Sequence, residues 1–172
     1  MIVLGLTGWS GAGKTTLMVS LIPILVGRGI SVSTMKHAHH AFDVDKPGKD
    51  SHRHREAGAT EVLVSSEHRW ALMHEHRGGQ EPTACDLMKH MTPVDLLLIE
   101  GFKREAHEKL EVFRRSLDKP LLSLDDPSFI AILSDGPVPE TTLPVIDLND
   151  VGAVADFIQD HCRLGRPRRI GP

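Results

Sequence analysis

The chain has 172 residues, of which 40% are hydrophobic and 25% are charged, a composition typical of one globular domain. Its net charge of −3 argues against a general affinity for nucleic acid or for anionic membranes, and we expect neither as a partner. The two cysteines, Cys85 and Cys162, form no closely spaced pair, which favours a reduced, cytoplasmic protein. We expect a single domain over residues 1–162 and a basic, flexible tail over residues 163–172.

Apolar and polar segments alternate along the chain at the spacing of short strands and helices. Nearly continuous apolar runs, such as residues 1–7 and 94–102, are typical of strands buried on both faces of a parallel sheet. The predicted strands cover residues 1–7, 30–36, 60–66, 69–75, 94–102, 109–115, 128–134 and 143–148. The predicted helices cover residues 16–29, 51–59, 81–91 and 149–162. This alternation indicates an α/β fold with a mainly parallel sheet, to which the third and fourth strands add an antiparallel hairpin.

Proline and capping residues predict where the helices bend and where they begin. Pro23 lies inside the first helix and should kink it, because proline lacks a backbone N–H donor. The predicted N-caps are Asp50 or Ser51 for the second helix and Asn149 or Asp150 for the last, since short polar side chains bond the free N–H groups of a first turn.

The segment GWSGAGKT, from Gly8 to Thr15, fits the phosphate-loop pattern and lies between a predicted strand and a predicted helix. Its glycines let the backbone wrap around phosphate oxygens, and the loop amides with the helix N-terminus form an anion-binding nest. Lys14 would neutralise terminal phosphates, and the Thr15 hydroxyl would ligate Mg²⁺. The residues expected to bind nucleotide are Gly8, Ser10, Gly11, Ala12, Gly13, Lys14, Thr15 and Thr16.

A triphosphate site also needs a carboxylate near its metal ion, and the strand VDLLLIEG offers one at each end. Ligands bind at the carboxyl ends of parallel strands, which selects Glu100 and places Asp95 at the opposite rim. Glu100 is therefore a predicted metal ligand, and with Lys14 it is the residue expected to take part in any hydrolysis. Gly101 would let the backbone pass close to the terminal phosphate.

The polar stretch from Lys36 to Gly58 contains five of the eleven histidines and follows the second predicted strand. Its start at the carboxyl end of a strand favours a loop that senses a terminal phosphate and its metal, as switch segments do. Lys36 would add an ammonium near the phosphates. Asp50, which opens a helix, is the third predicted metal ligand.

Several other residues of this region leave alternatives open. Asp43 and Asp45 are further candidates for direct or indirect Mg²⁺ contact. A transition-metal site is the rival interpretation, but His39 and His40 are adjacent, and His52 and His54 do not share a helix face.

Longer strings of the chain resemble the MobB family, adapter proteins of molybdopterin-guanine dinucleotide biosynthesis. The similar strings are GWSGAGKTTL, KHAHHAFDVDKPGKDSHRHREAGA, LLLIEGFK, KLEVFR, AILSD and IDLNDVGAVADFI. The histidine-rich string is the most selective of them, because many unrelated proteins share the phosphate loop.

The resemblance implies a three-layer P-loop NTPase fold that binds GTP with Mg²⁺, hydrolyses it slowly and forms a homodimer. It also implies partnership with the guanylyltransferase that joins GMP to molybdopterin, and molybdopterin itself is a candidate ligand. A more distant similarity to dethiobiotin synthetase implies phosphate or Mg²⁺ contacts for Lys36, Asp50 and Glu100. The chain lacks the Asn-Lys-x-Asp guanine motif, and Ser134 and Asp135 are the residues expected in its place, with a surface turn as the alternative.

Two other functions remain open from the sequence. A nickel- or zinc-delivery GTPase would use the histidines and bind its metal tightly. An ATP-dependent small-molecule kinase or synthetase would have a deep acceptor pocket and fast turnover.

Overall fold

The computed structural model describes residues 1–38 and 42–165 and divides into two compact units. The first unit combines Met1–His37 with Met91–Pro172, and the second is Ala38–His90. His39, His40 and the tail arginines Arg166, Arg168 and Arg169 lie outside the described residues. The boundary between one domain and a flexible tail at residue 163 stays a prediction.

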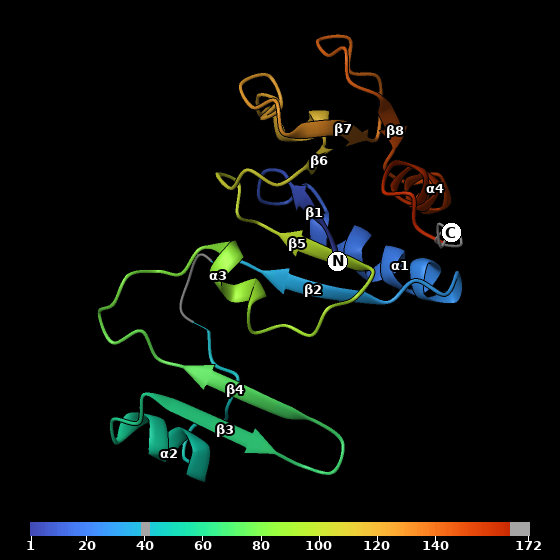
Figure 1. Cartoon of the computed structure of the whole chain (residues 1–172). Helices are drawn as coiled ribbons and strands as arrows, with labels where there is room; N and C mark the ends of the chain where they lie inside the picture. The colour runs from blue at the N-terminus through green and yellow to red at the C-terminus, as the bar shows by residue number, and fades with distance from the viewer. Residues whose placement is uncertain (39–41, 166–172) are drawn as a thin grey trace. The chain divides into compact units, whose positions relative to one another are not determined.

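The first unit carries the parallel strands and the two long helices (Figure 1). Its elements are β1 (Ile2–Thr7), α1 (Lys14–Gly27), β2 (Val32–Lys36), β5 (Leu96–Glu100), β6 (Lys109–Phe113), the 3-10 helix η1 (Arg115–Leu117), β7 (Phe129–Ser134), β8 (Val145–Asp147) and α4 (Val151–His161). The elements of the second unit are α2 (Asp50–Glu56), β3 (Glu61–Ser65), β4 (Trp70–His74) and α3 (Ala84–Met88).

The strands of the first unit form a six-stranded sheet in the order β2-β5-β1-β6-β7-β8. Every neighbouring pair is parallel, so the carboxyl ends of the strands meet at one edge of the sheet. At that edge Glu100 of β5 lies in register with Leu6 of β1 and with Lys36 of β2. The predicted α/β fold with a mainly parallel sheet is confirmed.

A hydrophobic core joins α1 and α4 to one face of the sheet. The helices contact each other, and their buried side chains pack against alternate residues of the central strands. The strand residues of this core include Leu4, Leu6, Leu96, Leu98, Leu110, Val112, Ala131 and Leu133, and the helix residues include Leu17, Leu21, Leu25, Val154 and Ile158. Strand β5 is buried throughout, as its continuous apolar run predicted.

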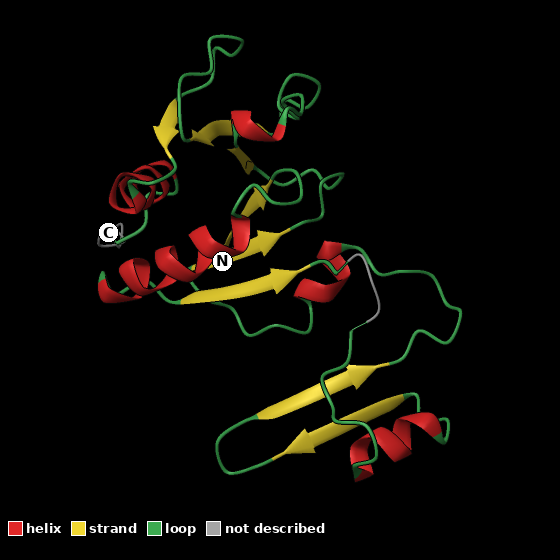
Figure 2. Cartoon of the chain, turned by 180° about the vertical axis from the view of Figure 1, so that it is seen from behind, coloured by secondary structure: helices red, strands yellow, loops and turns green. Residues whose placement is uncertain are grey.

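The second unit contains the predicted hairpin, in which β3 and β4 pair antiparallel from Glu61–His74 to Ser65–Trp70. Helix α2 lies beside this hairpin (Figure 2), and Val62 of β3 is 7% exposed. Among the described residues, no helix combines the length and the apolar character that crossing a bilayer requires.

The structure corrects two predicted helix starts. The N-cap of α2 is Lys49 rather than Asp50 or Ser51, because the first helical hydrogen bond runs from Arg53 N to Lys49 O. Asp50 therefore lies in the first helical turn, where a carboxylate interacts favourably with the helix dipole.

Helix α3 is shorter than the predicted 81–91, because Thr83 ends the preceding loop with a capping box. The Thr83 hydroxyl accepts from Asp86 N at 3.2 Å, and the Asp86 carboxylate accepts from Thr83 N at 3.4 Å. The predicted cap of α4 is confirmed, because Asp150 accepts from Ala153 N at 2.9 Å. Helix α1 contains Pro23 and continues to Gly27, and the kink expected at Pro23 stays a prediction.

Candidate functional site

The loop between β1 and α1 adopts a conformation that depends on its glycines. Gly11 and Gly13 have φ angles of 82° and 97°, in the left-handed region that glycine tolerates best. Gly13 is the N-cap of α1, so the amide groups of the first helical turn face the loop. A Cβ atom on Gly8 would lie 2.3 Å from the carbonyl oxygen of Val112, so only glycine lets the loop pass this close to β6.

Lys14 folds its side chain back over this loop. Its ammonium group donates to the carbonyl oxygens of Gly8 at 3.0 Å and Trp9 at 2.9 Å. Burial lowers the pKa of Lys14, an effect that Glu100 opposes and that Lys103 and Lys36 reinforce. A partly desolvated ammonium with other cations close by is suited to bind a negatively charged ligand.

Glu100 brings together residues from three segments at the carboxyl edge of the sheet. Its Oε1 accepts from the Thr15 hydroxyl at 2.9 Å and lies 3.4 Å from Nζ of Lys36. Glu100 is 8% exposed, whereas Asp95 lies at the opposite end of β5 and accepts from Ser31 N and Oγ. The sequence-based choice of Glu100 over Asp95 thus agrees with the placement of the two carboxylates.

The Thr15 hydroxyl and the Glu100 carboxylate supply adjacent oxygen donors of the kind that Mg²⁺ prefers. Mg²⁺ retains several waters in protein sites, so two protein oxygens beside a phosphate are a sufficient set. The residues present therefore fit a magnesium ion. Asp50, the third predicted ligand, belongs to the second unit, and its contact with the metal stays a prediction.

Ser134 and Asp135 lie at the carboxyl end of β7, as expected. Ser134 is 3% exposed, and its hydroxyl accepts from Gly136 N at 3.3 Å. The Asp135 carboxylate accepts from NH1 of Arg114 at 2.7 Å. Arg114 in turn donates from Nε to the carbonyl oxygen of Ala12 at 3.1 Å, so Asp135 is connected to the phosphate loop through this arginine.

The remaining predicted loop residues have simple surroundings. Ala12 is 1% exposed and contributes its carbonyl oxygen to Arg114. Ser10 and Thr16 are exposed, and the Thr16 carbonyl oxygen accepts from the hydroxyl of Ser20 at 3.2 Å.

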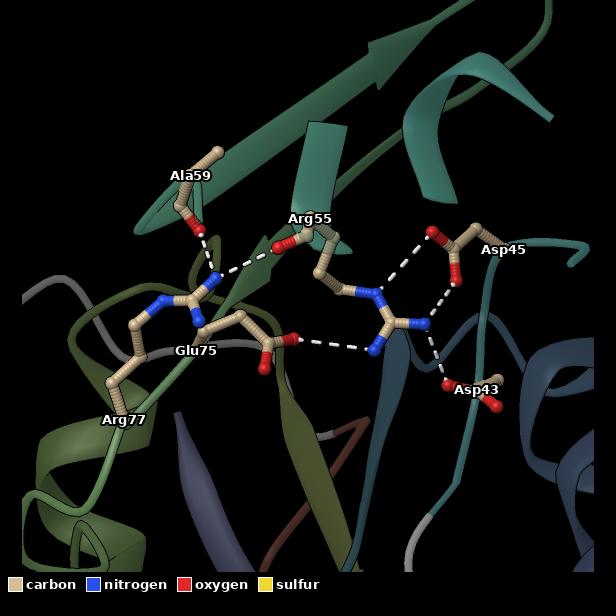
Figure 3. Close-up of polar contacts among 6 residues, drawn as sticks. All are labelled: Asp43, Asp45, Arg55, Ala59, Glu75 and Arg77. Carbon is tan, nitrogen blue, oxygen red and sulfur yellow. Dashed lines mark hydrogen bonds and ion pairs between the residues drawn. The ribbon is translucent and has the colours of Figure 1, made fainter. Parts of the chain in front are cut away.

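In the second unit, Asp43 and Asp45 are bound by Arg55 (Figure 3). The guanidinium of Arg55 contacts Asp43 at 2.8 Å, Asp45 at 3.0 Å and Glu75 at 3.7 Å, and these contacts raise the pKa of Arg55. Arg77 continues the network by donating to the carbonyl oxygens of Arg55 and Ala59. Asp43 and Asp45 therefore hold an arginine, and each would have to leave it to ligate a cation.

The part of the chain that the structure describes contains no group of three or more histidine, cysteine, aspartate or glutamate side chains that could hold a metal ion. His74 and His76 have ring centroids 5.7 Å apart, and His74 Nδ1 lies 2.8 Å from Glu61 Oε1. A pair of rings with one carboxylate falls short of a structural zinc site, which has four ligands.

The family model of MobB, molybdopterin guanine dinucleotide synthesis protein B, matches residues 3–135 of the chain. The chain belongs to this family. It is 41% identical over 161 residues to the molybdopterin-guanine dinucleotide biosynthesis adapter protein of Haemophilus influenzae, covering 92% of this chain and 88% of that protein. The Escherichia coli adapter protein is 43% identical over 159 residues, which is 91% of this chain and 90% of that protein.

The fold of this MobB family member also agrees with a solved structure. The crystal structure of a MobB homologue from Bacillus stearothermophilus matches with a TM-score of 0.69 at 23% sequence identity. The match covers 95% of this chain and 99% of that chain, and it supports the P-loop α/β fold.

Sequence reasoning missed the segment that follows β6 and braces the phosphate loop. Besides the contact of Arg114 with Ala12, the Trp9 indole donates to the carbonyl oxygen of Pro120 at 2.8 Å. Buried Glu111 fixes the next residues by accepting from the backbone of Leu122 at 2.7 Å and Ser123 at 2.9 Å. The one available signal was an arginine near the end of a predicted strand, which becomes informative only when that strand is known to neighbour β1.

Proposed function

We propose that this MobB family member is a GTP-binding adapter in molybdopterin guanine dinucleotide synthesis that assists the guanylyl-transferring enzyme and hydrolyses GTP slowly. The observation that supports it is the meeting of Lys14, Thr15, Lys36 and Glu100 at the carboxyl edge of the sheet. The names of the relatives from Haemophilus influenzae and Escherichia coli provide the biosynthetic role.

The proposed roles follow from the chemistry of each group. Lys14 would exchange its two carbonyl partners for oxygens of the terminal phosphates, with the loop amides binding the same phosphates. Thr15 and Glu100 would hold Mg²⁺. The ion would neutralise negative charge on the phosphates. Lys36, held 3.4 Å from Glu100, would remain close to the same charge.

Guanine selection is proposed for the end of β7. The carboxylate of Asp135 has the geometry to accept two N–H donors, which guanine offers at N1 and N2 and adenine does not. Within the protein, Asp135 contacts Arg114, which also contacts the phosphate loop at Ala12. Arg114 would therefore link the guanine end of the nucleotide to its phosphate end. Competition of GTP with ATP in a titration with Mg²⁺ tests this role, and equal affinities would refute it.

Slow hydrolysis follows from the surroundings of the cations. Arg114 is the arginine that contacts the phosphate loop, and its charge is compensated by Asp135. Arg55 is likewise held by carboxylates. Phosphate-loop proteins whose phosphate site lacks a catalytic arginine and a positioned water hydrolyse GTP well below ~1 s⁻¹, and a supplied arginine adds about 10³–10⁵ in rate.

We further propose that the protein is a cytoplasmic homodimer whose affinity for the partner is set by the bound nucleotide. The test measures binding of the guanylyl-transferring enzyme to this protein with a non-hydrolysable GTP analogue, with GDP and without nucleotide. We expect the three affinities to differ, and we expect the Lys14→Ala variant to lose the difference. Equal affinities in all three states, or rapid turnover by the isolated protein, would favour an enzyme with its own small substrate instead.

A further inference from the structure

The second residue of the phosphate loop, Trp9, supports a group of cations that the nucleotide motif does not include. The ammonium of Lys103, which follows β5, lies 4.8 Å from the centroid of the Trp9 ring. The ammonium of Lys119, which follows η1, lies 5.9 Å from the same centroid. Both distances are in the range of cation–π contacts, so one indole ring holds two lysines from separate loops.

The backbone fixes the position of both lysines. Lys103 follows Gly101 and Phe102, whose φ angles are 99° and 47°. A bulky residue in the left-handed region is strained, and such strain is concentrated at functional sites. Lys119 immediately precedes Pro120, whose carbonyl oxygen accepts from the Trp9 indole at 2.8 Å.

The charge of this region is not balanced. Within the described residues, neither Lys103 nor Lys119 lies within ion-pair distance of a carboxylate. Lys103 also lies close enough to Lys14 to lower its pKa, as Lys36 does. Gathering like charges costs free energy unless an anion joins them, and Glu100 already serves Lys36 and Thr15.

We propose that Trp9, Lys103 and Lys119 form a second anion-binding subsite beside the phosphate loop, which takes the phosphate group of a small phosphate monoester. Both ammonium groups lie within 6 Å of one ring centroid, which brings two positive charges to the surroundings of Trp9. A phosphate monoester carries about −1.5 to −2 charges near neutral pH and can neutralise both lysines, whereas a carboxylate can neutralise one. The partly exposed Trp9 side chain offers an apolar substituent of the ester a surface to contact.

The test uses Trp9 as its own reporter in the full chain carrying Trp70→Phe, which leaves Trp9 as the single tryptophan. The phosphate loop is saturated with Mg²⁺ and a non-hydrolysable GTP analogue, and inorganic phosphate or phenyl phosphate is then titrated by fluorescence and calorimetry. We expect saturable binding of both probes, tighter for phenyl phosphate. Because charge-assisted hydrogen bonds are strong, Lys103→Gln with Lys119→Gln should weaken binding by at least about tenfold. Lys46→Gln with Arg69→Gln removes the same charge from exposed positions and should change it by less than about twofold.

A second arm makes the result independent of the nucleotide, and only the first arm rests on the proposed function. Nucleotide-free Lys14→Ala protein, with its phosphate loop weakened, should still bind phenyl phosphate and lose it when both lysines become glutamine. Failure of the GTP analogue to bind would refute the proposed function, and this arm would still decide the subsite.

Three outcomes would overturn the subsite. The first is the absence of saturable phosphate binding in both arms. The second is a loss of affinity for the GTP analogue in the double glutamine variant as large as that of Lys14→Ala, which would make the lysines part of the triphosphate site. The third is tighter binding of a hexaglutamate peptide than of phenyl phosphate, which would indicate a surface for an acidic protein.

Discussion

Two groups of charged side chains, one in each unit, differ in their balance. In the second unit, Arg55 is surrounded by the carboxylates of Asp43, Asp45 and Glu75. At the phosphate loop, ammonium groups outnumber carboxylates, and Lys103 and Lys119 contact a ring instead of an acid. A cation held by carboxylates orders the chain around it, whereas cations without a carboxylate partner are suited to bind an anionic ligand.

Replacing Lys14 by alanine should produce the largest effect on binding that this comparison predicts. The ammonium serves no hydrophobic core and donates only to loop carbonyls, so the protein should stay folded. Loss of a charge-assisted phosphate contact should cost about 1.5–3 kcal/mol, which is on the order of 10- to 100-fold in nucleotide affinity. Calorimetric titration with GTP and Mg²⁺ measures it. Unchanged affinity would contradict the phosphate contact, and a melting temperature several degrees lower would show that Lys14 serves the fold.

Replacing Arg55 by alanine should have the opposite effect, a loss of stability rather than a loss of binding. Asp43, Asp45 and Glu75 would repel one another without their cation, and Asp45 has a side chain only 3% exposed. We expect lower stability of the second unit, visible as faster hydrogen exchange in α2 and the hairpin. Arg53→Ala is the matched control, because Arg53 is an exposed arginine of the same helix. Equal effects of the two substitutions would mean that the carboxylates do not depend on Arg55.

A smaller, pH-dependent effect should come from the compensated pair of Lys109 and Asp126 in the first unit. Lys109 is 1% exposed, and its ammonium donates to Asp126 at 2.8 Å. Burial by itself would raise the pKa of Asp126, but hydrogen bonds from Lys109 and Ser128 lower it to about 2, from 3.8 in the unfolded chain. The stability that this carboxylate contributes is therefore complete above about pH 4 and is lost as the pH falls toward 2.

Denaturant unfolding between pH 2 and pH 6 measures this contribution. Asp126→Asn should flatten the acid limb of the stability profile, whereas Asp125→Asn, at an exposed neighbouring position, should leave it as in the wild type. Identical acid limbs in all three proteins would mean that the buried lysine gains nothing from Asp126.

Much of the first unit could be predicted because its signals are local. The apolar runs of β1 and β5 are nearly continuous, whereas a half-buried strand needs apolar residues only at alternate positions. The phosphate loop combines glycines, a lysine and a threonine at a fixed spacing. The choice of Glu100 over Asp95 needed only the rule that ligands bind at the carboxyl ends of parallel strands.

The rest depends on strand order, which no local pattern states. Arg114 reaches Ala12, and Trp9 reaches Pro120, because β6 lies beside β1 in the sheet. The pairing of Asp43 and Asp45 with Arg55 is likewise tertiary, and from sequence these aspartates resemble metal ligands. Helix α3 was predicted too long because the capping box at Thr83 was not recognised as a start signal.

The order of β2 and β5 in the sheet also defines a route for redesigning the chain. These strands are parallel neighbours in register from Val32–Leu96 to Lys36–Glu100, so the whole second unit occupies the position of a crossover connection. A replacement linker must run from the end of β2 back to the start of β5, four residue steps or about 13 Å along the sheet. A helical hairpin or a graft from another protein could therefore take the place of Ala38–His90, and the phosphate-loop unit would become a scaffold with an exchangeable module.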